Sequence, residues 1–159
     1  MSGYFALDPR AIAPDDHLGA RVLLMGALGV TPYVDRAMEV LQLAERGQDG
    51  EHRALVIARD GTVAAMALFG AVAGAMGVVR IHAAVVAPGV GTDVGARLIA
   101  AVAAAARAED ARMLVAELPD DPAVRSIRAL LAAAGFHEEA RVPDFYRDGV
   151  ALSFLRLGL

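Results

Sequence analysis

The feature that most restricts the fold is a strand, a glycine-containing loop and a helix that follow one another between residues 80 and 107. Residues 81–86 form a short apolar run with three β-branched residues, which is typical of a strand. The run stops at Pro88, which cannot donate a hydrogen bond within a sheet. From Val94, apolar residues recur at helical spacing and alanine fills most other positions, so the sequence predicts a helix there.

The loop between this strand and helix is a candidate anion site. Three glycines, Gly89, Gly91 and Gly95, let a ligand approach the backbone, and the helix directs its free N–H groups and the positive end of its dipole at the loop. The spacing does not fit a dinucleotide fingerprint, which needs Gly-x-Gly-x-x-Gly and a later acidic residue. The alternative is that the glycines only turn the chain.

The loop resembles the acyl-CoA signature of the GNAT superfamily of N-acyltransferases, written Gln/Arg-x-x-Gly-x-Gly/Ala after a strand ending in Val-x-Pro. Val86-Ala87-Pro88 supplies the strand end, and Gly91-Thr92-Asp93-Val94-Gly95 supplies the loop. Near the C-terminus, the run Arg141-Val-Pro-Asp-Phe-Tyr-Arg-Asp-Gly149 resembles a bacterial subgroup of the same superfamily. This resemblance implies transfer of an acetyl group from acetyl-CoA to an amine by direct attack.

The order of elements agrees with this resemblance. We expect an edge strand within residues 4–12, two helices, a hairpin turning at Asp60-Gly61, and a further strand before the loop. A strand at 112–118 should be parallel to the strand before the loop, because a helix crosses over between them. A helix from Pro122 and strands at 136–142 and 150–157 complete an α+β GNAT fold, with a mixed, mostly antiparallel sheet of six to seven strands and about four helices. In the first helix, Leu18, Val22 and Leu23 should form one apolar face, with Leu24 as a further candidate.

The resemblance also implies how acetyl-CoA would be held. Backbone amides of residues 91–96 would bind the pyrophosphate, and the backbone of residues 85–87 would pair with the pantetheine arm. The predicted cofactor-binding residues are Val85, Val86, Ala87, Gly91, Thr92, Asp93, Val94, Gly95 and Ala96.

Three side chains are candidates for the chemistry. Glu117 lies at a strand end where the family uses a carboxylate base acting through water, and otherwise it is an exposed strand-end acid. His82 should lie on the same strand face as Ala84 and Val86, as a near-neutral base or as a histidine satisfied by a neighbour. Tyr146 is either the acid that protonates the leaving thiolate or an aromatic anchor for the last turn.

Three positions depart from the family pattern. Val90 stands directly before Gly91, so the loop lacks the usual opening Gln/Arg. Asp93 replaces a glycine and would repel a pyrophosphate unless its carboxylate turns away, and as a helix N-cap it would occupy the amides that a phosphate needs. Leu131 stands where many members place a tyrosine general acid. A GNAT-fold binding or scaffold protein of weak or lost activity is therefore the alternative to an enzyme.

Composition limits the remaining possibilities. A chain of 159 residues that is 57% hydrophobic is long enough for one domain spanning 1–159. The net charge of −4 argues against a nucleic-acid surface, the absence of cysteine removes thiolate chemistry, and four scattered histidines lack metal-ligand spacing. We expect no membrane segment, a cytoplasmic location and a possible homodimer. An amine on a small molecule or a peptide is the expected acceptor, with Tyr33, Asp35, Glu39 and Phe145 as candidate contacts by location.

Overall fold

A single sheet of seven strands organises the described part of the protein. The computed structural model describes residues 8–47 and 50–159, so most of the predicted 4–12 strand lies outside the described residues. The strand order is β1-β2-β3-β4-β5-β7-β6, and every neighbouring pair is antiparallel except β4 and β5. The strands are β1 (Arg10–Ala11), β2 (His52–Arg59), β3 (Thr62–Ala71), β4 (Val78–Val86), β5 (Met113–Pro119), β6 (His137–Arg147) and β7 (Val150–Gly158).

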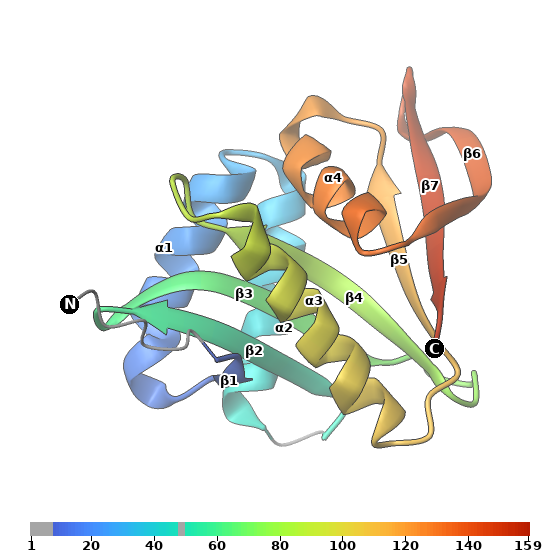
Figure 1. Ribbon diagram of the computed structural model, residues 1–159. Coiled ribbons are helices and arrows are strands. Elements are labelled where there is room, and N and C mark those ends of the chain that lie inside the picture. Colours follow the sequence, from blue (N-terminus) through green and yellow to red (C-terminus); the bar gives the residue numbers. More distant parts are fainter. Residues whose placement is uncertain (1–7, 48–49) are drawn as a thin grey trace.

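Helices cover both faces of this sheet. The helices α1 and α2 pack behind it and α3 and α4 in front of it, as Figure 1 shows. Their bounds are α1 (His17–Leu28), α2 (Pro32–Arg46), α3 (Thr92–Arg107) and α4 (Arg125–Ala133), with short 3₁₀ turns η1 (Pro14–Asp16) and η2 (Pro122–Val124) ahead of α1 and α4. The described residues thus confirm the predicted α+β architecture, including the parallel pairing of β4 with β5.

Local sequence signals explain most of the element boundaries. Thr31 and Pro32 start α2, and Gly47 ends it in the left-handed conformation at φ +58°. Asp60 and Gly61 turn the β2–β3 hairpin with φ values of +50° and +74°. Glycine adopts such positive φ values without strain, and aspartate tolerates them better than most residues. These boundaries are set by a few adjacent residues, so the sequence predicts them well.

The first helix buries only part of the predicted face. Leu23 and the further candidate Leu24 are buried, but Leu18 and Val22 are 74% and 62% exposed. Ala20 and Leu28 complete the buried face. Because α1 carries apolar side chains almost all round, its own periodicity does not select the buried face, and packing on the sheet decides it.

The last hairpin extends further than predicted. The strand expected at 136–142 continues to Arg147, but its pairing with β7 is irregular. Val142 pairs with Leu152 and Arg147 with Val150, so residues 143–146 lie opposite Ala151 alone. Pro143, which has no N–H group, and Asp144, at φ +53°, lie within this widened segment. The bulge pushes Phe145 and Tyr146 out of the regular ladder.

Candidate functional site

The parallel pair at the centre of the sheet comes apart part-way along its length. Pairing between β4 and β5 runs from Val78 with Met113 to Arg80 with Val115. Both strands continue beyond this point, β4 to Val86 and β5 to Pro119. The backbone groups that β4 directs toward β5 therefore lack a strand partner after Arg80, and a ligand can supply one. This is the splayed pair that the family resemblance implies.

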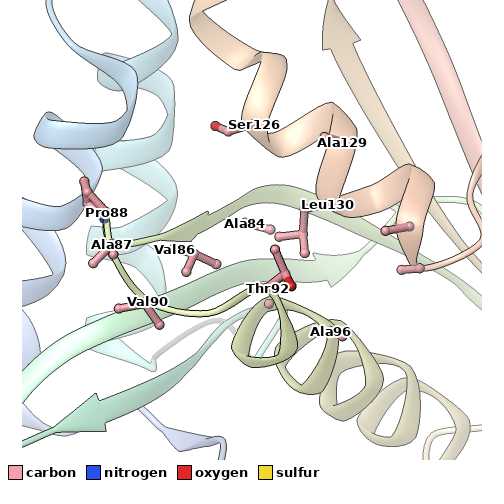
Figure 2. A pocket seen from close by; sticks show the side chains of 14 residues that line it. Ala84, Val86, Ala87, Pro88, Val90, Thr92, Ala96, Ser126, Ala129 and Leu130 are labelled. Atoms are coloured by element: carbon pink, nitrogen blue, oxygen red, sulfur yellow. The ribbon is translucent and has the colours of Figure 1, made fainter.

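A cavity of about 410 Å³ adjoins this opening. It lies between the end of β4, the loop after it and the facing sides of α3 and α4, as Figure 2 shows. Its size falls within the range of small-molecule sites. Most of the lining side chains are small and apolar, and Thr92 and Ser126 bring hydroxyl groups to it. The lining residues are Ala84, Val86, Ala87, Pro88, Gly89, Val90, Thr92, Gly95, Ala96, Ser126, Ala129, Leu130, Ala133 and Ala134.

The backbone at the end of β4 has one residue facing the opening. The Ala87 N–H donates to the Ala64 carbonyl at 2.8 Å, and the Ala87 carbonyl accepts from Val90 N–H at 3.2 Å. Because hydrogen-bonding groups alternate in direction along a strand, Val85 also faces β3 and Val86 faces the opening. The expectation that all of residues 85–87 pair with a ligand is therefore wrong for Val85 and Ala87, and only Val86 retains that orientation.

The N-terminus of α3 supplies free donors to the same region. Gly91 is its N-cap, so the prediction that Asp93 caps the helix is wrong. Val94 N–H donates to the Gly91 carbonyl at 3.1 Å, while the N–H groups of Thr92 and Asp93 have no partner within residues 8–47 and 50–159. The Asp93 carboxylate is 69% exposed and lies 3.9 Å from the Arg97 guanidinium, one helical turn on. The carboxylate makes no capping hydrogen bond, so the Thr92 and Asp93 N–H groups stay free, although Asp93 Oδ1 lies where a β-carbon on Gly91 would stand.

Some of the predicted cofactor-binding residues line the cavity and the others do not. Five of them, Val86, Ala87, Thr92, Gly95 and Ala96, line the cavity. Val85 and Val94 are buried in the core, and Gly91 and Asp93 are exposed at the start of α3.

Gly95 shows why the loop and helix need glycine. A β-carbon at this position would lie 2.5 Å from Leu130 Cδ1 and 3.3 Å from Val86 Cγ2. The missing side chain therefore lets α3 approach both α4 and the end of β4, which shapes the wall of the cavity.

Charged and aromatic side chains gather at the opening, away from the cavity. Arg80, the last β4 residue paired with β5, donates from Nη2 to Glu117 Oε1 at 3.1 Å. Glu117 lies two residues beyond the last paired position on β5. Partial burial raises the pKa of Tyr146, and the negative charge of Glu117 raises it further. The structure thus brings Glu117 and Tyr146 together, and Tyr146 stays protonated at neutral pH.

His82 lies elsewhere than predicted. Phe69 pairs with Ile81 and Leu68 with Ala83, so His82 is an extra residue in a β-bulge of β4. Ala84 and Val86 line the cavity beneath α3 and α4, whereas the His82 ring lies 5.6 Å from His52. The prediction of a shared face is therefore wrong.

The His82 environment also disfavours a charged imidazole. Burial, with a smaller contribution from the positive charges of His52, Arg80 and Arg36, lowers the pKa of His82 to about 4. The ring is neutral at pH 7, but it is a weaker base than the near-neutral pKa of the prediction requires.

A second cluster at the opening joins Tyr33, a candidate contact from the sequence, to Asp121 and Arg147, which the sequence did not indicate. Tyr33, at the start of α2, donates its hydroxyl to Asp121 Oδ2 at 3.2 Å, and Arg147 Nη2 donates to the same oxygen at 2.8 Å. Hydrogen bonds from Ala123 N–H, Arg147 and Tyr33 hold the pKa of Asp121 below its usual value. Tyr33 and Asp121 are 88 residues apart, and no local signal in the sequence joins them.

Two further features concern alternatives raised by the sequence. Leu131 is fully buried in the core, so the position where many family members place a tyrosine holds an apolar core side chain. Within the described ranges, no three His, Asp or Glu side chains group as metal ligands. No helix among the same residues has both the length and the apolarity needed to span a bilayer.

Solved structures identify the architecture. A proposed acetyltransferase of the GNAT family from Desulfovibrio desulfuricans superimposes with a TM-score of 0.81 at 26% identity, covering 94% of this chain and 97% of that one. The chain has the GNAT fold. A proposed acetyltransferase from Salmonella typhimurium, crystallised with acetyl-CoA, gives a TM-score of 0.72 at 23% identity over 95% and 92% of the two chains. The aminoglycoside 6'-N-acetyltransferase from Enterococcus faecium gives 0.75 at 11% identity over 94% and 96%.

The similarity of this GNAT-fold chain to known proteins is found by comparing structures. No protein-family model matches the sequence. No curated protein matches it either. The structural similarity nevertheless covers nearly the whole length of each structural neighbour reported above.

Proposed function

We propose that this protein is an N-acetyltransferase that transfers the acetyl group of acetyl-CoA to an amine. The observation that carries the proposal is the end of β4–β5 pairing at Arg80 and Val115, beside a cavity of about 410 Å³ at the N-terminus of α3. This combination offers an elongated ligand an unpaired strand edge and free N–H donors in one continuous region.

The residues on the cavity side fit acetyl-CoA as a co-substrate. The N–H groups of Thr92 and Asp93 would hold the pyrophosphate, and the backbone of Val86 would pair with the pantetheine arm. The small side chains of α3 and α4 leave room for the rest of the molecule. Acetyl-CoA supplies an acyl group activated as a thioester, so the protein needs no nucleophile of its own.

Two side chains at the opening would move protons. The Glu117 carboxylate would accept a proton from the acceptor ammonium through a water molecule, which leaves the amine free to attack. The Tyr146 phenol would donate its proton to the sulfur as the carbon–sulfur bond breaks, because it is protonated at neutral pH. His82, with a pKa of about 4, is a weaker base than the near-neutral imidazole that the sequence suggests.

A binding or scaffold protein without activity is the second candidate. None of the side chains that line the cavity is cationic, and Asp93 adds a negative charge at the loop. If backbone amides alone hold the pyrophosphate too weakly, acetyl-CoA will not bind at cellular concentrations.

Binding and turnover of acetyl-CoA test the two candidates. Acetyl-CoA at 100 times its dissociation constant should raise the free energy of unfolding by about 2.7 kcal/mol, measured by thermal shift. Release of free thiol in the presence of an amine panel then measures transfer. A protein that is not stabilised by millimolar acetyl-CoA and releases no thiol would be a scaffold.

A matched pair of variants places the binding in the cavity. Ala129 lines the cavity and Ala132 does not, although both are exposed on α4. Ala129→Trp should weaken acetyl-CoA binding by roughly a hundredfold or more because the indole fills the site, whereas Ala132→Trp should leave binding within about twofold. Equal affinities in the two variants would move the binding site away from this cavity.

A further inference from the structure

Three aromatic side chains form an exposed wall beside the opening between β4 and β5. The chain has three tyrosines, five phenylalanines and no tryptophan. Tyr33 and Tyr146 have ring centroids 6.0 Å apart, and Phe145 and Tyr146 have theirs 5.1 Å apart, both in edge-to-face geometry. Phe145 is 58% exposed and Tyr146 is 38% exposed. We call Tyr33, Phe145 and Tyr146 the aromatic wall.

The fold holds the aromatic wall in place although its rings are not in the core. The hydroxyl of Tyr33 donates to Asp121, which also accepts hydrogen bonds from Ala123 N–H and Arg147. On the other element, the widened segment of β6 carries Phe145 and Tyr146.

Asp144 fixes the course of that widened segment. Its Oδ1 accepts a hydrogen bond from Gly149 N–H at 2.7 Å across the turn to β7. Rings fixed from two elements lose little freedom on binding, and solvent-exposed aromatic surface of this kind is typical of a recognition site.

The charges next to the aromatic wall are already compensated. Glu117 is paired with Arg80 at 3.1 Å, and Asp121 is paired with Arg147 at 2.8 Å. Arg36 in α2, which is itself paired with Glu39 at 2.9 Å, and His52 lie near the same side of β4, since both lower the pKa of His82. A second or third ammonium group on an acceptor would therefore gain little here, because the nearby carboxylates are already paired with arginines. An apolar group on the acceptor would contact the exposed aromatic rings.

We infer that the acceptor is a monoamine carried on an aromatic ring, with the ring seated against the aromatic wall and the amine directed to Glu117. This inference rests on the proposed transferase function and adds the substrate class. The aromatic wall supplies edge-to-face contacts, which contribute about 0.5–1.5 kcal/mol each beyond buried area. A polyamine or an aminoglycoside gains none of these contacts.

Acceptor kinetics with matched amines test the substrate class. 2-Phenylethylamine, propylamine and spermidine are compared with saturating acetyl-CoA, and thiol release is measured. In the wild-type protein, kcat/KM for 2-phenylethylamine should exceed that for propylamine by roughly tenfold or more. Phe145→Ala should raise KM for 2-phenylethylamine about three- to tenfold with kcat nearly unchanged, and should leave propylamine within about twofold.

Two further variants separate recognition from folding. Phe145→Tyr should restore the KM for 2-phenylethylamine, because a tyrosine ring offers the same stacking surface. Met76→Ala removes another exposed apolar side chain, in the turn before β4, and should change neither KM. A Phe145→Ala effect that Phe145→Tyr does not reverse would overturn the inference.

A binding measurement without acetyl-CoA distinguishes the inference from the proposed function. Quenching of tyrosine fluorescence by 2-phenylethylamine should weaken in Phe145→Ala. If this binding is seen but no thiol is released with any amine, the aromatic wall is supported and the transferase function fails. If spermidine or propylamine is acetylated as efficiently as 2-phenylethylamine, the transferase function holds and the substrate class is overturned.

Discussion

The two sides of the opening offer different parts of the chain to the two ligands that we propose. The donor side, formed by the end of β4, the following loop and the facing sides of α3 and α4, offers backbone N–H groups and small apolar side chains. The acceptor side, formed by α2, the Arg80 and His82 region of β4, Glu117, Asp121 and the bulge of β6, offers paired charges and aromatic rings. The same strand, β4, serves both.

This difference indicates which sequence changes each side tolerates. A backbone amide is present whatever the side chain, so a donor side built on amides can keep its geometry with Val90 or Asp93 in the loop. The acceptor side depends on side chains that meet across long sequence separations, and a substitution there removes the contact itself. We therefore expect large effects from changes on the acceptor side and small effects from charge changes on the donor side.

The largest effect is expected at Glu117. Glu117→Gln keeps the shape of the side chain but removes its ability to accept a proton, so kcat should fall by roughly 10²–10⁴. Affinity for acetyl-CoA should stay within about twofold, because the donor side is untouched. Steady-state kinetics and thermal shift measure the two quantities. Glu109→Gln, an exposed acid beyond the C-terminal end of α3, controls for the loss of a negative charge.

A Glu117→Gln enzyme with wild-type kcat would contradict the expectation that changes on the acceptor side have large effects. The proton would then leave through another group, and the ion pair with Arg80 would serve only to hold the two strands at their point of separation.

The sequence predicts the frame of the molecule better than it predicts the acceptor side. Gly47, the Asp60-Gly61 turn and the strand before Pro88 are read from adjacent residues, and the structure confirms them. The resemblance to GNAT enzymes adds the splayed strands, which no periodicity indicates. Gly95 and Thr92 line the cavity, because they lie on a helix whose start the loop defines, and their role in holding a ligand stays a prediction.

The features that the sequence did not predict depend on contacts between residues far apart in the chain. His82 changes face because of a bulge that is defined by the pairing of Leu68 and Phe69 in another strand. The contact of Tyr33 with Tyr146 joins residues from α2 and β6, and the bulge that exposes Tyr146 arises from pairing with β7. Leu18 and Leu24 have the same hydropathy, so only the packed structure shows which one is buried.

A smaller effect is expected on stability, from the half-buried His82 on the acceptor side. The folded-state pKa of His82 is lowered to about 4 from an unfolded value near 6.5, so the unfolded chain binds the proton more readily between these values. Stability from the neutral ring is complete above pH 6.5 and is lost as the pH falls toward 4. After allowance for partial exposure, the loss is about 2 kcal/mol.

Urea unfolding at pH 7 and pH 4.5 measures this loss. His82→Gln carries no titrating ring, so its free energy of unfolding should fall less between the two pH values than that of the wild type, by about 2 kcal/mol. Equal losses in both proteins would mean that carboxylates, and not the bulged histidine of β4, set the acid sensitivity of the acceptor side.

The smallest effect is expected on the donor side, at Asp93. Asp93→Asn removes a negative charge that would repel a pyrophosphate at the loop. We nevertheless expect the dissociation constant of acetyl-CoA to change by less than about threefold. The carboxylate is 69% exposed and faces Arg97, and an exposed charge is screened by solvent and salt. Isothermal titration at low and physiological salt measures the affinity. A gain of tenfold or more, larger at low salt, would show that a side-chain charge and not the amide geometry limits donor binding, and the contrast between the two sides of the opening would no longer hold.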